Sequence, residues 1–302
     1  MDEKDCLILQ YLYKDQNLTK AAERLYMTQP ALTYRVRQIE KEFQTDILAK
    51  NGKNIKMTPA GEYLVSYAKK MLLDLRETKE YLLNMGSETK GSLKLGISSH
   101  FGLYNLPSIL EEYMVNCPMV HLNVDTGFST EMMELLMQGE IDVAIVKGDY
   151  EWFDERFLLE EENICIISKD EIPVDSLPEF PMINRKEPNV LLKYRNISQI
   201  PSEKGIDYWW NERFTSPPLV MMQVDSYETC KEMVKRGFGY AIIPRVFLQK
   251  DDDLFSHDLI FKNGEELKRR TWMLYRKSSL QLASVSQFVS EIKKLFCYSE
   301  NN

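Results

Sequence analysis

The chain has 302 residues, of which 44% are hydrophobic and 28% are charged, and its formal net charge is −8. This length suggests about two domains, and the composition is that of a globular protein, which excludes a disordered or fibrous chain. The start, MDEKDCLILQ, is acidic and its apolar run is too short for a signal peptide or a membrane span. We therefore expect a cytoplasmic protein with no membrane partner.

Charge is distributed unevenly along the chain. Residues 1–90 carry a net charge of +2 and residues 91–302 a net charge of −10, while residues 35–56 alone carry +3. Such a basic patch can meet phosphates, although charge alone also fits a solvated surface. The five cysteines are scattered and have neither metal-ligand nor CxxC spacing, so we interpret them as buried thiols and expect no metal or other cofactor. They are Cys6, Cys117, Cys165, Cys230 and Cys297.

The stretch LTKAAERLYMTQPALTYRVRQIEKEF, from Leu18 to Phe43, predicts two amphipathic helices. In the second helix Leu32, Val36, Ile39 and Phe43 form one apolar stripe that faces a core. Thr28 is the predicted N-cap, with Gln29 and Pro30 in the first turn. The face away from the stripe presents Pro30, Thr33, Tyr34, Arg37 and Lys41. These side chains suit the major groove of DNA, which admits a single α-helix.

A lysine-decorated hairpin is predicted next, in AKNGKNIKMTPAGEYL. Asn51 and Gly52 indicate the tight turn, and Lys50, Lys53 and Lys56 surround it. Beside a recognition helix, such a wing adds salt-dependent affinity for the DNA backbone without reading sequence. Taken alone, the segment fits an ordinary hairpin with lysines on its edge equally well.

A long helix follows from Pro59, with apolar residues at alternating spacings of four and three. This heptad seam consists of Leu64, Ala68, Met71, Leu75, Thr78, Leu82 and Met85. A helix of this length spans on the order of 40 Å, and little neighbouring chain is available to cover the seam. We therefore expect a second copy of the chain to cover it; packing on the chain's own larger domain is the alternative.

The order helix, helix, wing and long helix resembles that of LysR-type transcriptional regulators, and the remaining chain has the length of their effector domain. The resemblance implies a winged helix-turn-helix DNA-binding domain at 1–58, a dimerising linker helix at 59–90 and an effector-binding domain at 91–302. It further implies a homodimer or homotetramer on double-stranded DNA. We expect DNA contacts from Thr28, Gln29, Pro30, Thr33, Tyr34, Arg35, Arg37, Lys50 and Lys53.

Two of these positions depart from the family pattern. Lys53 matches a wing position that is usually arginine. The family often has arginine where this chain has Tyr34, and Arg35 follows it. Base preference therefore cannot be transferred from other members.

Residues 91–302 have the pattern of an α/β domain. Short apolar runs (LKLGI, VHLNV, IDVAIV, ICIIS, LVMMQV and YAIIP) alternate with amphipathic helices, which predicts parallel sheets. The family's effector domain shares its fold with two-lobed periplasmic solute-binding proteins. By this resemblance, lobe one comprises about 91–163 and 269–302, lobe two about 164–268, and the two crossings form a hinge.

Polar turns after the strands predict an effector site, because ligands of α/β sheets bind beyond the carboxyl ends of strands. The predicted site residues are Ser98, Ser99, His100, Phe128, Ser129, Thr130, Lys147, Asp225 and Ser226. The resemblance implies that five of them, Ser98, Ser99, Phe128, Ser129 and Thr130, line the inducer cleft. Hydroxyl groups with Lys147 favour a carboxylate, whereas Asp225 would suit the ammonium group of an amino acid. For each single Ser or Thr, a helix N-cap is the alternative.

Other classes of protein fit the sequence less well. GxSxG, Walker, HExxH and GxGxxG motifs do not occur, so we do not expect an enzyme. His100 has no carboxylate partner in sequence and indicates neither a metal site nor a general base. A cytoplasmic small-molecule receptor would need neither a recognition helix nor a heptad seam. An effector-independent regulator and a redox-sensing regulator of the same fold remain alternatives, the latter requiring two facing cysteines.

Overall fold

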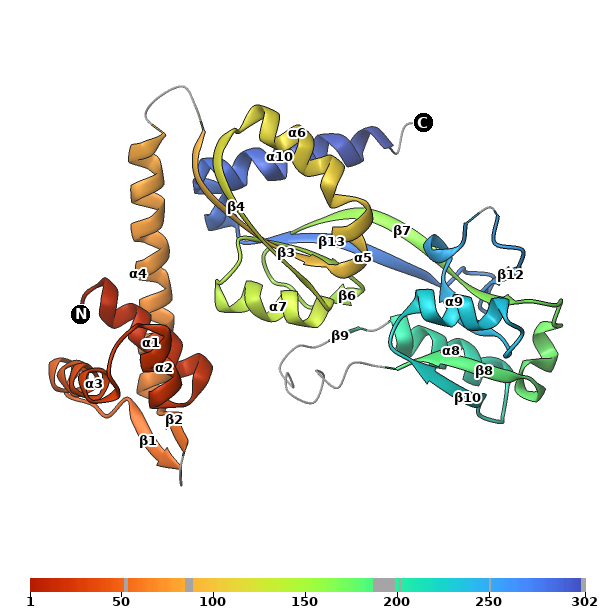
Figure 1. Ribbon diagram of the computed structural model, residues 1–302, viewed down its shortest axis with the longest axis horizontal. Helices are drawn as coiled ribbons and strands as arrows, with labels where there is room; N and C mark the ends of the chain where they lie inside the picture. Colours follow the sequence, from red (N-terminus) through yellow and green to blue (C-terminus); the bar gives the residue numbers. More distant parts are fainter. Residues whose placement is uncertain (52–53, 85–88, 187–198, 201, 250, 300–302) are drawn as a thin grey trace. The chain divides into compact units, whose positions relative to one another are not determined.

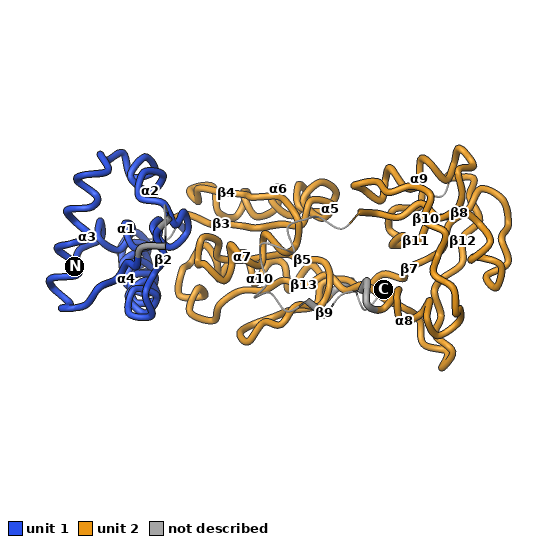
Figure 2. The backbone as a smooth tube through the Cα atoms, turned by 90° about the horizontal axis from the view of Figure 1, so that it is seen from below, with its two compact units in different colours: residues 1–90 blue, residues 91–302 orange. Residues whose placement is uncertain are grey.

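The computed structural model describes residues 1–51, 54–84, 89–186, 199–200, 202–249 and 251–299 (Figure 1). The chain divides into two compact units, Met1–Lys90 and Gly91–Asn302, drawn in different colours in Figure 2. Each unit has its own hydrophobic core. Within the described ranges, no helix is long and apolar enough to cross a membrane.

The first unit contains the expected helix pair, hairpin and long helix, preceded by a further helix. Its elements are α1 Glu3–Asp15, α2 Leu18–Arg24, α3 Gln29–Phe43, β1 Leu48–Asn51, β2 Asn54–Met57 and α4 Pro59–Leu83. Asp2, Asn17, Thr28 and Thr58 cap the four helices, each accepting a hydrogen bond from a backbone N–H of the first turn. Local sequence therefore defines where each helix begins.

Helix α1 covers the first part of the stripe of α4 that the heptad pattern marks. Leu64 and Ala68 are buried in the core that α1 shares, and the Sγ atom of Cys6 lies 4.0 Å from the Sδ atom of Met71. Further along, Lys79 Nζ lies 3.3 Å from Glu3 Oε1. The sequence analysis did not include α1, so it found no cover for this stripe within the chain. Leu75 is half-buried, and Leu82 is exposed.

The second unit is a two-lobed α/β structure. Lobe one contains β3 Lys90–Ser98, α5 Ser99–Tyr104, α6 Leu106–Asn116, β4 Met119–Gly127, α7 Ser129–Gln138, β5 Val143–Lys147, β6 Asp149–Tyr150, η4 Lys277–Gln281 and α10 Ala283–Ser299. Lobe two contains η1 Val174–Glu179, β8 Pro181–Arg185, α8 Ser202–Arg213, β10 Leu219–Val224, α9 Tyr227–Lys235, β11 Ala241–Pro244, η3 Arg245–Phe247 and β12 Phe255–Asp258. The short strand β9 Gln199–Ile200 precedes α8 in the chain but pairs with β6 of lobe one. In lobe one, α6 and α10 lie on one face of the sheet and α7 on the other (Figure 1).

Two long strands, β7 Glu155–Ser168 and β13 Lys268–Tyr275, join the lobes. The largest sheet has the order β11-β7-β13-β5-β3-β4, with β12 also on β7. Strand β13 pairs with the first part of β7, from Tyr275↔Glu155 to Lys268↔Asn163, and β11 and β12 pair with the last part. A register shift between Thr271 and Trp272 leaves Leu159 without a partner on β13, which is a β-bulge.

The sheets are mixed rather than parallel throughout. β3 pairs with β5 in parallel and β8 with β10 in parallel, as expected from the alternating pattern. β13 is antiparallel to both β5 and β7. The reason is the hinge, because one strand leaves lobe one and the other returns to it, so the two run in opposite directions.

Candidate functional site

The outer face of α3 presents the side chains that the sequence assigned to DNA. Thr28, Gln29 and Pro30 are exposed at its start, and Tyr34 and Arg37 are exposed further along. Thr33 is half-buried, and its hydroxyl donates to the Gln29 carbonyl oxygen at 2.9 Å. The opposite face, with Leu32, Val36 and Ile39, is buried. Packing of this apolar face therefore fixes which side chains point outward.

Arg35 has a different environment from the other predicted DNA contacts. Its Nη2 atom lies 2.7 Å from Asp2 Oδ2 and 2.7 Å from Asp5 Oδ1 at the start of α1. The Asp5 amide and then Arg35 lower the pKa of the Asp2 carboxyl, and the hydrogen bond to Asp2 raises the pKa of Arg35. These pairs tie α3 to α1, which argues against the expected role of Arg35 in DNA contact.

Tyr26 is a surface residue that the sequence analysis missed. It lies in the turn between α2 and α3, with φ 52° and a side chain that is 98% exposed. A left-handed backbone is uncommon for an aromatic residue and is found at turns and functional sites. No turn signal marks this position, because Leu25-Tyr26-Met27 contains neither glycine nor asparagine.

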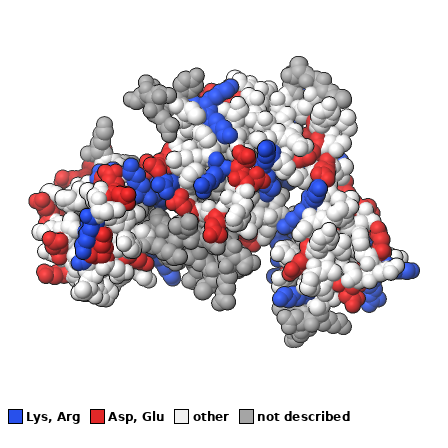
Figure 3. All heavy atoms as spheres, turned by 180° about the vertical axis from the view of Figure 1, so that it is seen from behind, with Lys and Arg blue, Asp and Glu red and all other residues white. Residues whose placement is uncertain are grey.

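The wing forms as a two-stranded antiparallel hairpin, in which Asn51 pairs with Asn54. Lys53 and the side chain of Lys50 lie outside the described residues, so their assignment rests on sequence alone. On the face seen in Figure 3, basic and acidic side chains are interspersed.

Polar side chains meet where β3, β4 and β5 end in lobe one. The Ser99 hydroxyl donates to the Gly127 carbonyl oxygen at 3.2 Å, and the Lys147 amide donates to Ser129 Oγ at 3.0 Å. Phe128 is exposed, and its amide donates to the Glu131 carboxylate of the first turn of α7. The structure thus gathers these residues of the predicted set at one edge of the sheet.

Four hydroxyl groups in lobe one are buried without a hydrogen-bond partner among the described residues; one is that of Ser279 in η4. The other three belong to Ser98, Thr130 and Thr271, whose exposed fractions are 6%, 5% and 1%. Burying a hydroxyl group without a partner costs on the order of 1–3 kcal/mol. These groups therefore indicate a place where a polar ligand or water supplies the missing hydrogen bonds.

Lys147 is already paired, contrary to its expected role as an available positive charge. Its Nζ atom lies 3.1 Å from Glu162 Oε1, and Arg269 Nη2 lies 2.6 Å from the same oxygen. Burial lowers the pKa of Lys147; burial would raise the pKa of Glu162, but Arg269 and Lys147 hold it below its usual value. Burial also raises the pKa of nearby Glu160, which accepts a hydrogen bond from Asn105 at 3.2 Å. We call Lys147, Glu160, Glu162 and Arg269 the hinge charge cluster.

His100 connects this cluster to lobe two. Its ring centroid lies 4.5 Å from that of Phe247 in η3 and 4.7 Å from that of Tyr104. Burial, followed by the positive charges of Lys147 and Arg269, lowers the pKa of His100 to about 4. The imidazole is therefore neutral near pH 7 and packs as an aromatic group.

The two residues predicted from lobe two have separate surroundings. Ser226 is the N-cap of α9, where its Oγ accepts from the Thr229 amide at 3.1 Å, and Asp225 is exposed. Lobe two instead contributes Tyr227 and Phe247, whose ring centroids lie 5.6 and 5.9 Å from the Arg269 guanidinium. Sequence reasoning missed Glu162, Arg269 and Thr271, because their meeting depends on how β7 and β13 pair.

Comparison with known proteins identifies the family to which the chain belongs. Residues 4–62 match the family model described as "Bacterial regulatory helix-turn-helix protein, lysR family", and residues 86–296 match "LysR substrate binding domain". The chain belongs to the LysR family of transcriptional regulators. Proteins of this family bind DNA, oligomerise and bind small-molecule effectors; its relatives are regulators rather than enzymes.

Individual relatives match nearly the whole chain. It is 39% identical over 293 residues to the uncharacterized HTH-type transcriptional regulator YraN of Bacillus subtilis, covering 97% of this chain and 98% of that protein. It is 30% identical to YkuM of the same species, covering 98% of each. A full-length OxyR variant from Pseudomonas aeruginosa has the same fold, with a TM-score of 0.63, 19% identity, and coverage of 97% and 95% of the two chains.

The pKa of His100 predicts a pH dependence of stability. Between the ordinary value of 6.5 and about 4, the unfolded chain binds a proton that the folded chain does not. The free energy of unfolding should therefore fall as the pH drops through this window, by up to about 1.4 kcal/mol per pH unit from this group. Urea unfolding between pH 7 and pH 5 should show a shallower decline for His100→Gln than for the wild type. His121→Gln, at an exposed position, is the control; equal slopes for all three proteins would contradict the prediction.

Proposed function

We propose that this LysR-type regulator reads DNA through the first two turns of α3. Gln29, Pro30, Thr33 and Tyr34 would meet base edges in the major groove, and Arg37 would meet a phosphate. The observation that carries this proposal is the exposed polar face of α3 opposite its buried stripe. Arg37 is exposed and makes no ion pair within the described part of the chain. Tyr26, beside the start of α3, is added as a backbone contact, and Arg35 is left out because Asp2 and Asp5 hold it.

Substitutions on α3 should separate base reading from phosphate contact. Gln29→Ala should reduce discrimination between the chain's own promoter region and a scrambled duplex by ~1–3 kcal/mol. Arg37→Ala should weaken binding to both duplexes equally. The slope of log K against log salt concentration should become shallower by about 1. Lys4→Ala, which removes an exposed lysine from α1, is the charge-matched control for titrations at several salt concentrations. An equal loss on both duplexes for Gln29→Ala would argue against base reading.

We further propose that a second copy packs against the part of α4 that α1 leaves exposed. Large apolar side chains are exposed there, and exposed apolar patches on a helix mark interaction surfaces. They belong to Tyr63, Tyr67, Tyr81, Leu82 and Leu83. This replaces most of the seam expected from the heptad pattern, since Leu64 and Ala68 are already buried within one chain.

Charges placed on this surface should break the oligomer. The double variant Tyr81→Glu/Leu82→Glu should sediment at a lower mass than the wild type at micromolar concentration, because two carboxylates would have to be desolvated at the contact. Ser66→Glu, also exposed on α4, is the control that should keep the wild-type mass. Unchanged sedimentation of the double variant would place the contact elsewhere.

For the effector, we propose a small polar molecule bound between the lobes beside the hinge charge cluster. The hydroxyl groups of Ser98, Thr130 and Thr271, and the Oε2 atom of Glu162, are buried and lack hydrogen bonds within the described residues. The cluster holds two carboxyl groups and two basic groups, so its charges nearly balance. That balance favours a molecule with both an acidic and an amino or hydroxyl group over a simple carboxylate.

Regulation then follows from a difference in affinity. The ligand has to bind one arrangement of the lobes more tightly than the other, because equal affinity would shift no equilibrium. A redox mechanism has less support. Burial raises the pKa of Cys165 to about 12 and that of Cys230 to about 11, which disfavours the reactive thiolate in both.

An isosteric substitution tests the effector site. Thr130→Val removes an unsatisfied hydroxyl with little change in volume, so the ligand-free chain should be at least as stable as the wild type. A thermal-shift screen of organic acids and amino acids should yield ligands whose affinity falls by about tenfold or more in this variant. Ser108→Ala, an exposed serine of α6, is the control. A ligand whose affinity is unchanged by Thr130→Val would show that the site lies elsewhere. If the screen identified no ligand, an effector-independent regulator would be favoured.

A further inference from the structure

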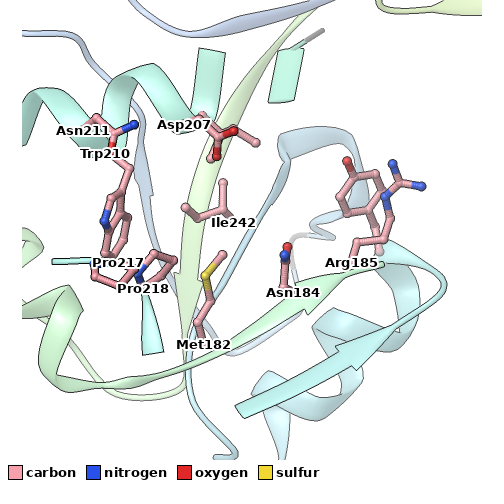
Figure 4. Close-up of a pocket in the computed structure, with 11 residues that line it drawn as sticks. Met182, Asn184, Arg185, Asp207, Trp210, Asn211, Pro217, Pro218 and Ile242 are labelled. Carbon is pink, nitrogen blue, oxygen red and sulfur yellow. The ribbon is translucent and has the colours of Figure 1, made fainter. Parts of the chain in front are cut away.

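The cavity of lobe two adjoins the hinge charge cluster. It has a volume of about 230 Å³ and lies between α8 and the strands β8 and β11 (Figure 4). Tyr227, which lines it, also contacts Arg269 of the cluster, with 5.6 Å between the guanidinium and the ring centroid. Because the cavity and the cluster share this contact, the cavity defines no ligand of its own. The outer face of α3 is a different surface, and its chemistry limits the base pairs that it can read.

The middle of the outer face of α3 is apolar in its first two turns. Pro30 and Tyr34 lie one helical turn apart there, opposite the buried stripe of Leu32, Val36 and Ile39. Both residues are exposed, Tyr34 by 62%. The phenol ring is therefore the largest exposed side chain of these two turns.

The same two turns lack an available group for reading a G·C pair. Arginine or lysine reads guanine, and a carboxylate reads cytosine. Residues 29–36 contain neither lysine nor a carboxylate, and Arg35 is their single cation. Its Nη2 atom lies 2.7 Å from Asp2 Oδ2 and 2.7 Å from Asp5 Oδ1, so this guanidinium is already paired. The next cation, Arg37, follows in a later turn, beyond the N-terminal residues with which recognition helices contact base edges.

The remaining groups of this surface favour an A·T pair. The Thr33 hydroxyl donates to the Gln29 carbonyl oxygen at 2.9 Å, so its proton is used within the helix. The amide of the exposed Gln29 side chain is suited to adenine. In the major groove thymine alone carries an apolar group, its C5-methyl, which apolar side chains recognise by contact. The ring of Tyr34 is placed to make such a contact.

We infer that Tyr34 is a specificity-determining residue that selects thymine. Its ring packs against the C5-methyl group of one thymine in the major groove, so an A·T pair is required at that position. The inference rests on the proposed function, because it needs α3 to lie in that groove. Burial of one methyl group in such a contact corresponds to about fourfold in affinity.

Replacement of single thymines tests the contact. A duplex is first selected from a pool of randomised base pairs with the full-length chain, and each of its thymines is then replaced by deoxyuridine, which lacks only the methyl group. Binding should weaken by about fourfold at one thymine position in the wild type and in Tyr34→Phe, which keeps the ring. In Tyr34→Ala the same replacement should have no effect, because no ring remains to contact the methyl group.

A further substitution should change the base that is read. Tyr34→Arg supplies a guanidinium in the middle of the outer face, so selection from the same pool should replace the A·T pair by G·C, with guanine preferred by about tenfold. Because Tyr34 is exposed, its variants should fold normally. Gln38→Ala, exposed one turn beyond Tyr34, is the control and should keep both the A·T pair and the effect of deoxyuridine.

The possible outcomes distinguish the thymine contact from the proposed function. If no sequence were enriched from the pool, both would be overturned. A sequence might instead be enriched in which no deoxyuridine position loses its effect in Tyr34→Ala, or in which the position altered by Tyr34→Arg holds G·C for the wild type. Either result would refute the thymine contact alone, and base reading by α3 would stand.

Discussion

The polar interior of the second unit depends on one mostly buried carboxylate, that of Glu162. A single oxygen of this group lies within hydrogen-bond distance of both Lys147 and Arg269, so it links three neighbouring strands, β5, β7 and β13. Buried charges are tolerated only when they are paired, and loss of the carboxylate would leave two buried cations. The position of Arg269 in turn determines where the Tyr227 and Phe247 rings of lobe two can pack. One acidic side chain thus holds together the polar interior at which we propose that the effector binds.

The first unit is held together mainly by apolar packing between α1 and α4. Helix α4 carries a long apolar stripe, and α1 covers much of it, so the unit has a core without help from a second copy. The ion pairs of Arg35 with Asp2 and Asp5 fix α3 against the start of the same α1. As a result α1, which contributes no residue to the proposed DNA surface, determines the orientation of the helix that does.

Much of the architecture could be predicted from sequence because it is encoded locally. The caps of α3 and α4 and the stripe Leu32, Val36 and Ile39 follow from spacing within a few residues. Ser99, Ser129 and Lys147 could be placed together because strand ends meet at one edge of a sheet. The pairing of Glu162 with Arg269 could not be predicted, since it joins residues 107 positions apart across two hinge strands. The cover of α4 by α1 was missed for the same reason, because contacts between distant segments leave no periodic signal.

The bulge at Leu159 gives the hinge a mechanical character. Two strands that pair over eight positions form a ribbon, which resists bending in its plane far more than twisting about its length. The extra residue interrupts this ribbon next to Glu160, where a bulge bends the strand and increases its local twist. The direction in which the two strands leave lobe one therefore depends on a short segment, and Glu160 and Glu162 of the hinge charge cluster lie in it. A molecule bound at that point would change the twist of the paired strands β7 and β13. A small change in twist there would become a larger displacement at the far ends of the lobes.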